Sequence, residues 1–163
     1  MFATARSQPQ SPSALHEEVR TLARALFEGE RDRTANAANL AALLFHSFPD
    51  LNWAGFYWLR GEELVLGPFQ GKPACVRIPL GKGVCGTAAA RARSVVVPDV
   101  NAFPGHIACD SASRSEVVVP VMRGGRVLGV LDLDSPRPGR FTEEDARALE
   151  ALVEIFVAAT ELD

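Results

Sequence analysis

The chain has few cysteines, no long apolar run and no basic cluster, and each absence excludes a class of protein. Its 163 residues contain three cysteines, Cys75, Cys85 and Cys109, and an odd number argues against the fully paired disulfide framework of a small secreted protein. No apolar run approaches the roughly 20 residues that cross a bilayer. The first thirty residues hold no apolar signal-peptide core. We therefore expect a cytoplasmic protein with no membrane partner.

The charges are nearly balanced, with a formal net charge of −3 at pH 7. Because the basic residues form no cluster that would follow a phosphate backbone, nucleic acid is not an expected partner. The length suits one domain that buries its own core. Residues 1–13 are rich in Ser, Pro, Gln and Ala without apolar periodicity, so we interpret them as a flexible N-terminal arm and 14–163 as a single domain.

Apolar periodicity and turn residues predict an α+β fold with an antiparallel sheet flanked by helices. Turns at 61–62 and 124–125 join the strands on either side into hairpins. The expected elements are helices from Ser13 to near Gly29, from Asp32 or Thr34 to Pro49, at 84–93 and from Thr142, and strands at 52–60, 63–69, 76–80, 94–97, 115–123 and 126–134.

The turn before the third helix reads Gly81-x-Gly83-x-x-Gly86, which is the dinucleotide-binding fingerprint. That motif follows the first strand of a parallel unit and has an acidic residue about 20 positions later. Here hairpins precede the motif, and Asp99 comes too early. The alternative is that the glycines permit a tight turn into a helix.

Each cysteine lies beside glycine, proline or a helix start instead of inside an apolar run. Such settings favour accessible thiols, and a helix N-terminus or a nearby cation lowers a thiol pKa. The cysteines are therefore candidates for chemistry and not for core packing.

Five blocks that include these cysteines resemble the GAF-domain free methionine-R-sulfoxide reductases. The blocks are Gly71–Cys75, Gly81–Thr87, Phe103–Asp110, Ser115–Pro120 and Gly129–Ser135, and the similarity runs from about Trp53 to the C-terminal helix. The resemblance implies that 14–163 form a single GAF domain, that the protein is an oxidoreductase active in oxidative stress, and that it forms a homodimer.

The resemblance also implies a thiol mechanism. Cys109 attacks free L-methionine-(R)-sulfoxide and becomes a sulfenic acid, which Cys75 resolves as an intramolecular disulfide while Cys85 substitutes or assists. Thioredoxin, as external reductant, restores the thiols. No bound cofactor and no metal are implied.

Three carboxylates and two aromatic residues complete the predicted site. Asp132 and Asp134 share one face of their strand, and the hairpin brings Glu116 opposite that end. Clustered carboxylates can raise one pKa so that this group donates a proton, while an ionised partner binds an ammonium group. The resemblance assigns substrate binding to all three, catalysis also to Glu116 and Asp134, and contact with the substrate methyl to aromatics such as Trp53 and Tyr57. Without the resemblance, these residues would read as solvated strand ends and core packing.

Two rival interpretations remain. His106 could join the three cysteines in a Cys₃His zinc site, although the usual Cys-x₂₋₄-Cys pair is missing. A GAF domain could also sense a small ligand without catalysis, but a sensor would not require three cysteines.

Overall fold

The elements of the computed structural model, which describes residues 11–107 and 110–162, confirm the predicted α+β fold class and both hairpins. They are α1 (Pro12–Phe27), α2 (Arg33–Ser47), β1 (Trp53–Arg60), β2 (Glu63–Gly71), β3 (Arg77–Pro79), α3 (Gly83–Arg91), β4 (Val95–Val97), the 3₁₀ turn η1 (Val100–Ala102), β5 (Ser115–Arg123), β6 (Arg126–Ser135) and α4 (Glu143–Ala159). The ends of the helices and strands differ from the predicted ones by one or two residues.

The strands form one sheet in the order β3-β2-β1-β6-β5-β4. Every neighbouring pair is antiparallel, which excludes the dinucleotide-binding interpretation because that fold needs parallel strands. The glycines instead shape the turn into α3. Gly83 has a φ of +59°, and a Cβ on Gly86 would lie 2.4 Å from the Pro79 carbonyl oxygen.

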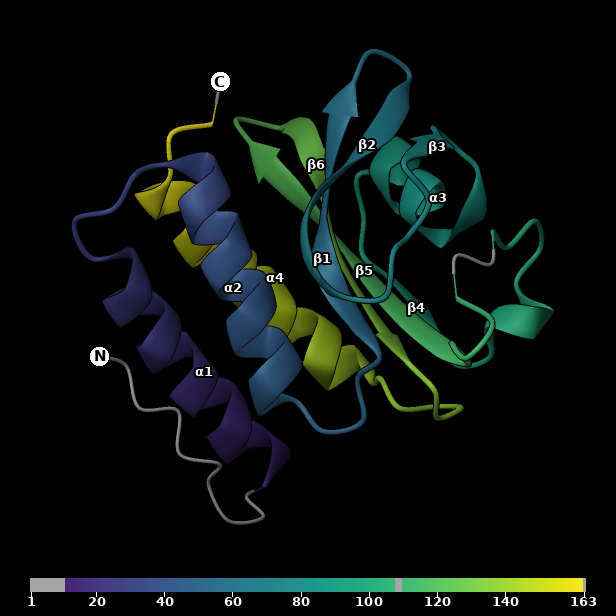
Figure 1. The fold of residues 1–163 in the computed structure, drawn as a ribbon, viewed down its shortest axis with the longest axis horizontal. Helices are drawn as coiled ribbons and strands as arrows, with labels where there is room; N and C mark the ends of the chain where they lie inside the picture. The colour runs from purple at the N-terminus through teal and green to yellow at the C-terminus, as the bar shows by residue number, and fades with distance from the viewer. Residues whose placement is uncertain (1–10, 108–109, 163) are drawn as a thin grey trace.

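The two faces of the sheet are covered differently. Helices α2 and α4 pack on one face with α1 against them, and α3 lies on the other face (Figure 1). Alternate residues of β1 therefore go to separate clusters: Phe56 and Trp58 join the core under the three helices, and Trp53 and Tyr57 face α3. Within the described residues, no helix combines the length and apolar character that a bilayer span requires.

Side-chain caps determine where α2 and α4 begin. Of the two expected starts of α2, Asp32 is the one that caps the helix. A capping box begins α4, with Thr142 and Asp145 each bonding the other's main chain. His16 Nε2 of α1 also lies 3.0 Å from Asp145 Oδ1 in a buried contact. This contact joins the first helix to the last.

Replacing Thr142 by alanine should lower the free energy of unfolding by about 1 kcal/mol, because the Asp145 N–H loses the oxygen that accepts it. Thr21→Ala is the matched control, since Thr21 is an exposed threonine inside α1, and it should change stability by less than about 0.5 kcal/mol. Chemical denaturation of both variants measures the difference. Equal free energies of unfolding for Thr142→Ala and the parent would show that the cap does not stabilise the protein.

Candidate active site

A partly open pocket lies between α3 and the sheet face away from the other three helices. Its empty volume is about 510 Å³, part of which is open to solvent. Its lining comes from segments far apart in the sequence: Trp53, Tyr57, Pro73, Ala74, Ile78, Gly83, Val84, Cys85, His106, Ile107, Asp110, Ser113, Glu116, Asp132 and Asp134.

The structure brings most of the predicted site residues to this pocket. The residues that line it are Trp53, Tyr57, Cys85, Glu116, Asp132 and Asp134. Cys75 is half-buried in the segment between β2 and β3, directly after the lining residues Pro73 and Ala74. Cys109 lies outside the described residues.

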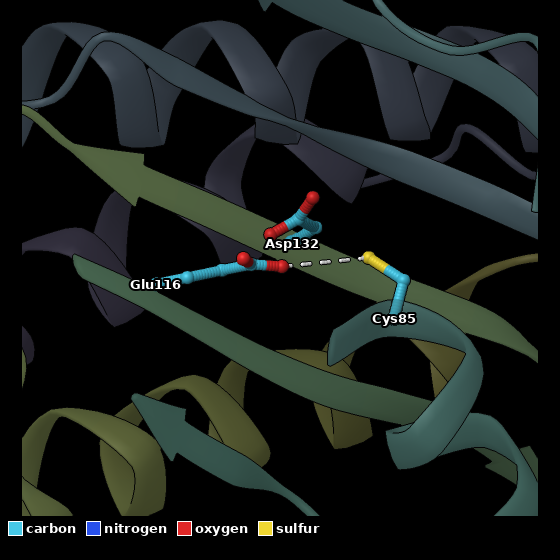
Figure 2. Close-up of side chains that lie close together, drawn as sticks. All are labelled: Cys85, Glu116 and Asp132. Carbon is cyan, nitrogen blue, oxygen red and sulfur yellow. Dashed lines mark hydrogen bonds between the residues drawn. The ribbon is translucent and has the colours of Figure 1, made fainter. Parts of the chain in front are cut away.

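Strand register places the three carboxylates together. Glu116 of β5 pairs with Asp134 of β6, and Asp132 pairs on its other side with Gly55 of β1. Only 6% of Glu116 and 5% of Asp132 is exposed, whereas Asp134 is partly exposed. Figure 2 shows the side chains of Glu116, Asp132 and Cys85 converging from β5, β6 and α3. The sequence prediction that Glu116 lies opposite the Asp132 and Asp134 end is confirmed.

Burial is the main cause that raises the pKa of each of these three carboxyl groups well above its usual range. Repulsion between their negative charges raises these pKa values further. The charge of Asp134 raises the pKa of Glu116, that of Glu116 raises the pKa of Asp132, and that of Asp132 raises the pKa of Asp134. The described part of the lining includes no lysine or arginine to offset this charge. The cluster therefore keeps its protons to a higher pH than exposed carboxyl groups do.

Cys85 lies in the first turn of α3 with 4% of its surface exposed. Burial, and then the charges of Asp132 and Glu116, raise the pKa of its thiol. Its Sγ donates to Glu116 Oε1 over 3.9 Å. The sequence-based expectation of an accessible thiol with a lowered pKa is wrong for Cys85, because desolvation and two nearby acids outweigh the helix N-terminus.

Trp53 and Tyr57 form an apolar wall of the pocket. The Trp53 ring stacks on that of Tyr57 at a centroid separation of 5.8 Å and on Phe69 at 5.3 Å. Their polar atoms bond the main chain of a neighbouring segment: Trp53 Nε1 donates to the Lys72 carbonyl over 3.2 Å, and the Tyr57 hydroxyl to that of Cys75 over 3.0 Å. The rings are thereby held in place.

A polar group beside the carboxylates was missed by the sequence reasoning. Asn52 Nδ2 donates to Asp110 Oδ2 over 3.2 Å and to Ser113 Oγ over 3.0 Å. The main-chain N–H of Ala112 is the largest cause that lowers the pKa of Asp110. Asp110 could have been found, because it directly follows Cys109 in a polar loop. No local signal marked Asn52, whose two partners are distant in sequence.

His106 is partly buried. It lines the pocket, and its Nε2 lies 3.7 Å from Glu116 Oε2. Burial lowers the pKa of its imidazole, so the neutral ring faces the acid at neutral pH. The described residues on either side of Cys109, Ile107 and Asp110, also line the pocket.

Asp132→Asn should stabilise the protein increasingly as the pH rises. The pKa of Asp132 is higher in the folded chain than in the unfolded one, so the parent loses stability once the unfolded chain begins to release this proton, near pH 4. The gain should be absent below that pH and grow by up to about 1.4 kcal/mol per pH unit above it. Denaturation between pH 4 and pH 8 measures the effect, with Glu62→Gln, on an exposed acid, as the control. A difference between Asp132→Asn and the parent that does not change with pH would contradict the raised pKa.

Comparison with known proteins agrees with the fold. A GAF domain model matches residues 34–161. The chain is 56% identical over 129 residues to a free methionine-R-sulfoxide reductase of Escherichia coli, a match covering 79% of this chain and 78% of that protein. It is 45% identical over 139 residues to one of Saccharomyces cerevisiae, covering 80% and 77%.

A solved structure extends the similarity to three dimensions. The X-ray structure of free methionine-R-sulfoxide reductase from Neisseria meningitidis in complex with its substrate matches with a TM-score of 0.93 at 46% identity, covering 98% of this chain and 95% of that one. Fold, sequence and pocket thus agree. The chain belongs to the GAF domain family and, within it, to the free methionine-R-sulfoxide reductases, which are oxidoreductases.

Proposed function

We propose that this protein uses its own thiols to reduce free L-methionine-(R)-sulfoxide to L-methionine. The observation that carries the proposal is a buried carboxylate cluster, Glu116, Asp132 and Asp134, in one pocket with the aromatic wall of Trp53 and Tyr57. A free amino acid with an ammonium group and a methyl sulfoxide matches these two surfaces. The similarity to proteins named for this activity supports the same conclusion.

Cys109 is the proposed attacking residue. Its thiolate bonds to the sulfoxide sulfur, and the sulfoxide oxygen takes up a proton. The hydroxyl then passes from the methionine sulfur to the Cys109 sulfur as the sulfur–sulfur bond breaks, which gives methionine and a Cys109 sulfenic acid. A second thiol then attacks that sulfur, forming a disulfide and releasing water. Thioredoxin reduces the disulfide by thiol–disulfide exchange, so one sulfoxide consumes two electrons and two protons. The pocket positions of Ile107 and Asp110 support this role.

Cys75 is the preferred resolving residue over Cys85. An attacking thiol must be deprotonated, and the pKa of the Cys85 thiol is raised by burial and by Asp132 and Glu116. Cys85 is consequently a protonated thiol at neutral pH and is better suited to hydrogen bonding within the carboxylate cluster. Cys75 lies next to the pocket lining in a less buried segment.

The carboxylate cluster supplies both the proton and the charge that the reaction needs. A carboxyl group that stays protonated at neutral pH can donate to the departing oxygen. A carboxylate that ionises when substrate enters pairs with the ammonium group, which removes part of the cost of burying negative charge. Glu116 and Asp134 are the proposed acids, and Asp132 joins them in binding the ammonium group.

The proposed cycle needs no bound cofactor and no metal. It needs free thiols, which cells maintain in the cytoplasm, so that compartment and a role in oxidative stress stay predictions. A homodimer also stays a prediction, based on the family resemblance. The division into an N-terminal arm and a single domain at 14–163 stays a prediction too, based on composition and on the resemblance. The rival interpretation is a GAF module that binds a small ligand without turnover.

With thioredoxin, thioredoxin reductase and free methionine-R-sulfoxide, the parent should consume NADPH, and the N-acetylated substrate should react at least about tenfold more slowly because it has no ammonium group to pair with a carboxylate. Asp134→Asn and Glu116→Gln should lose at least about tenfold in kcat/KM without losing stability. Loss of NADPH absorbance measures the rates of the parent on both substrates and the rates of the two variants. Ligand binding without NADPH consumption would favour the sensor, and equal rates on both substrates would remove the ammonium role.

In a single turnover without thioredoxin, Cys109→Ser should release no methionine, since no other thiol is proposed to attack the sulfoxide. Cys75→Ser should release methionine in that first turnover. With thioredoxin present, Cys75→Ser should recycle slowly, and Cys85→Ser should recycle faster than Cys75→Ser. Quenched samples separated by chromatography measure the methionine formed. Methionine from Cys109→Ser would move the nucleophile, and normal recycling by Cys75→Ser would assign resolution to Cys85.

A further inference from the structure

Three potential metal ligands converge at the bottom of the pocket. Cys85 Sγ, a carboxylate oxygen of Glu116 and one of Asp132 all lie within 4.8 Å of one another, and they come from α3, β5 and β6 (Figure 2). In a tetrahedral zinc site with bonds of about 2.0–2.3 Å, ligand atoms lie about 3.3–3.8 Å apart. Side-chain adjustments of about 1 Å would therefore bring these atoms to coordination distance.

One carboxylate oxygen of this group lacks a hydrogen-bond partner among the described residues. Asp132 is 5% exposed, and its Oδ1 makes no hydrogen bond within the part of the chain that the structure describes. A buried, unpaired carboxylate oxygen is costly. It marks a position that a bound cation would occupy, and it is an observation separate from the closeness of the three side chains.

His106 lies near these ligands but does not join them. Its Nε2 is 3.7 Å from Glu116 Oε2, but only Cys85, Glu116 and Asp132 offer ligand atoms within 4.8 Å of one another among the described residues, so a water molecule would complete the coordination. Zinc would displace the protons of the thiol and the two carboxyl groups. A thiolate with two carboxylates favours zinc over Mg²⁺ or Ca²⁺, which prefer six or more oxygen ligands.

We propose that Cys85, Glu116 and Asp132 form a zinc site inside the pocket, and that a bound zinc ion excludes the amino-acid substrate. This set differs from the Cys₃His combination suggested by sequence, because two carboxylates replace two of the cysteines and His106 is not a ligand. Exclusion of substrate rests on the proposed function, which assigns Glu116 and Asp132 to the ammonium group. The metal site itself does not depend on that function.

Calorimetric titration of the reduced, metal-free full chain with zinc chloride tests the site. The parent should bind one zinc ion, and Cys85→Ser and Asp132→Asn should each weaken binding by at least about tenfold. Cys75→Ser and Asp134→Asn are the matched controls and should change it by less than about threefold. Equal affinity for magnesium chloride, or loss of zinc binding in Cys75→Ser instead of Cys85→Ser, would overturn the proposal.

Cobalt supplies a readout that does not depend on variant stability. Co²⁺ bound to the parent should show a sulfur-to-metal charge-transfer band, because Cys85 is a ligand. Zinc should remove that band by displacing cobalt. Cobalt binding without the band would show that Cys85 is not a ligand and would overturn the proposal even if Cys85→Ser fails to fold.

Competition separates this proposal from the proposed function. Free methionine-R-sulfoxide should weaken apparent zinc binding, and zinc should raise the KM of turnover without lowering kcat at saturating substrate. Zinc binding that depends on Cys85 in a protein without turnover would support the metal site and refute the reductase proposal. If the parent turns over substrate and Cys85→Ser binds zinc as tightly as the parent, the reductase proposal would be supported and the metal site refuted.

Discussion

Three carboxyl groups gathered on one face of a sheet are the constraint on which the rest of this molecule depends. Glu116 and Asp132 are almost fully enclosed, and Asp134 lies beside them. Groups in such a site either retain protons or require a cation, because the low dielectric strengthens their repulsion and removes their hydration. This condition is the basis of the proposed ammonium binding and of the proposed proton donation. It also lowers the stability of the free protein.

The other face of the sheet offsets that cost. Phe56 and Trp58 of β1 pack with Phe156 of α4 at ring separations of 5.1 and 6.3 Å, inside a core formed with α1 and α2. Burial of that much apolar surface is the dominant favourable contribution to folding. The antiparallel sheet thus divides its two roles between its faces, since alternate side chains of each strand point to opposite sides.

Strand register determines which side chains face the pocket. The pairing of Glu116 with Asp134 places two acids side by side on β5 and β6. Asp132, two residues before Asp134 on the same face of β6, pairs with Gly55 of β1. A slip of one residue would turn the carboxylates into the apolar core. A Cβ on Gly55 would lie 2.7 Å from the Trp53 ring, so this glycine lets the indole lie over the strand beside the acids.

Local patterns in the sequence were enough to specify the hairpins, the α4 cap and the shared face of Asp132 and Asp134, because turns, caps and strand parity depend on residues a few positions apart. The family resemblance, not periodicity, singled out Trp53 and Tyr57. The state of Cys85 could not be predicted. Its setting beside glycine and a helix start suggested a reactive thiol, but its pKa depends on how α3 packs against carboxylates on two strands. The bonds of Asn52 were also hidden, since they join segments that meet only after the sheet has formed. Burial and long-range charge are properties of the folded arrangement, and only the tertiary structure determined them.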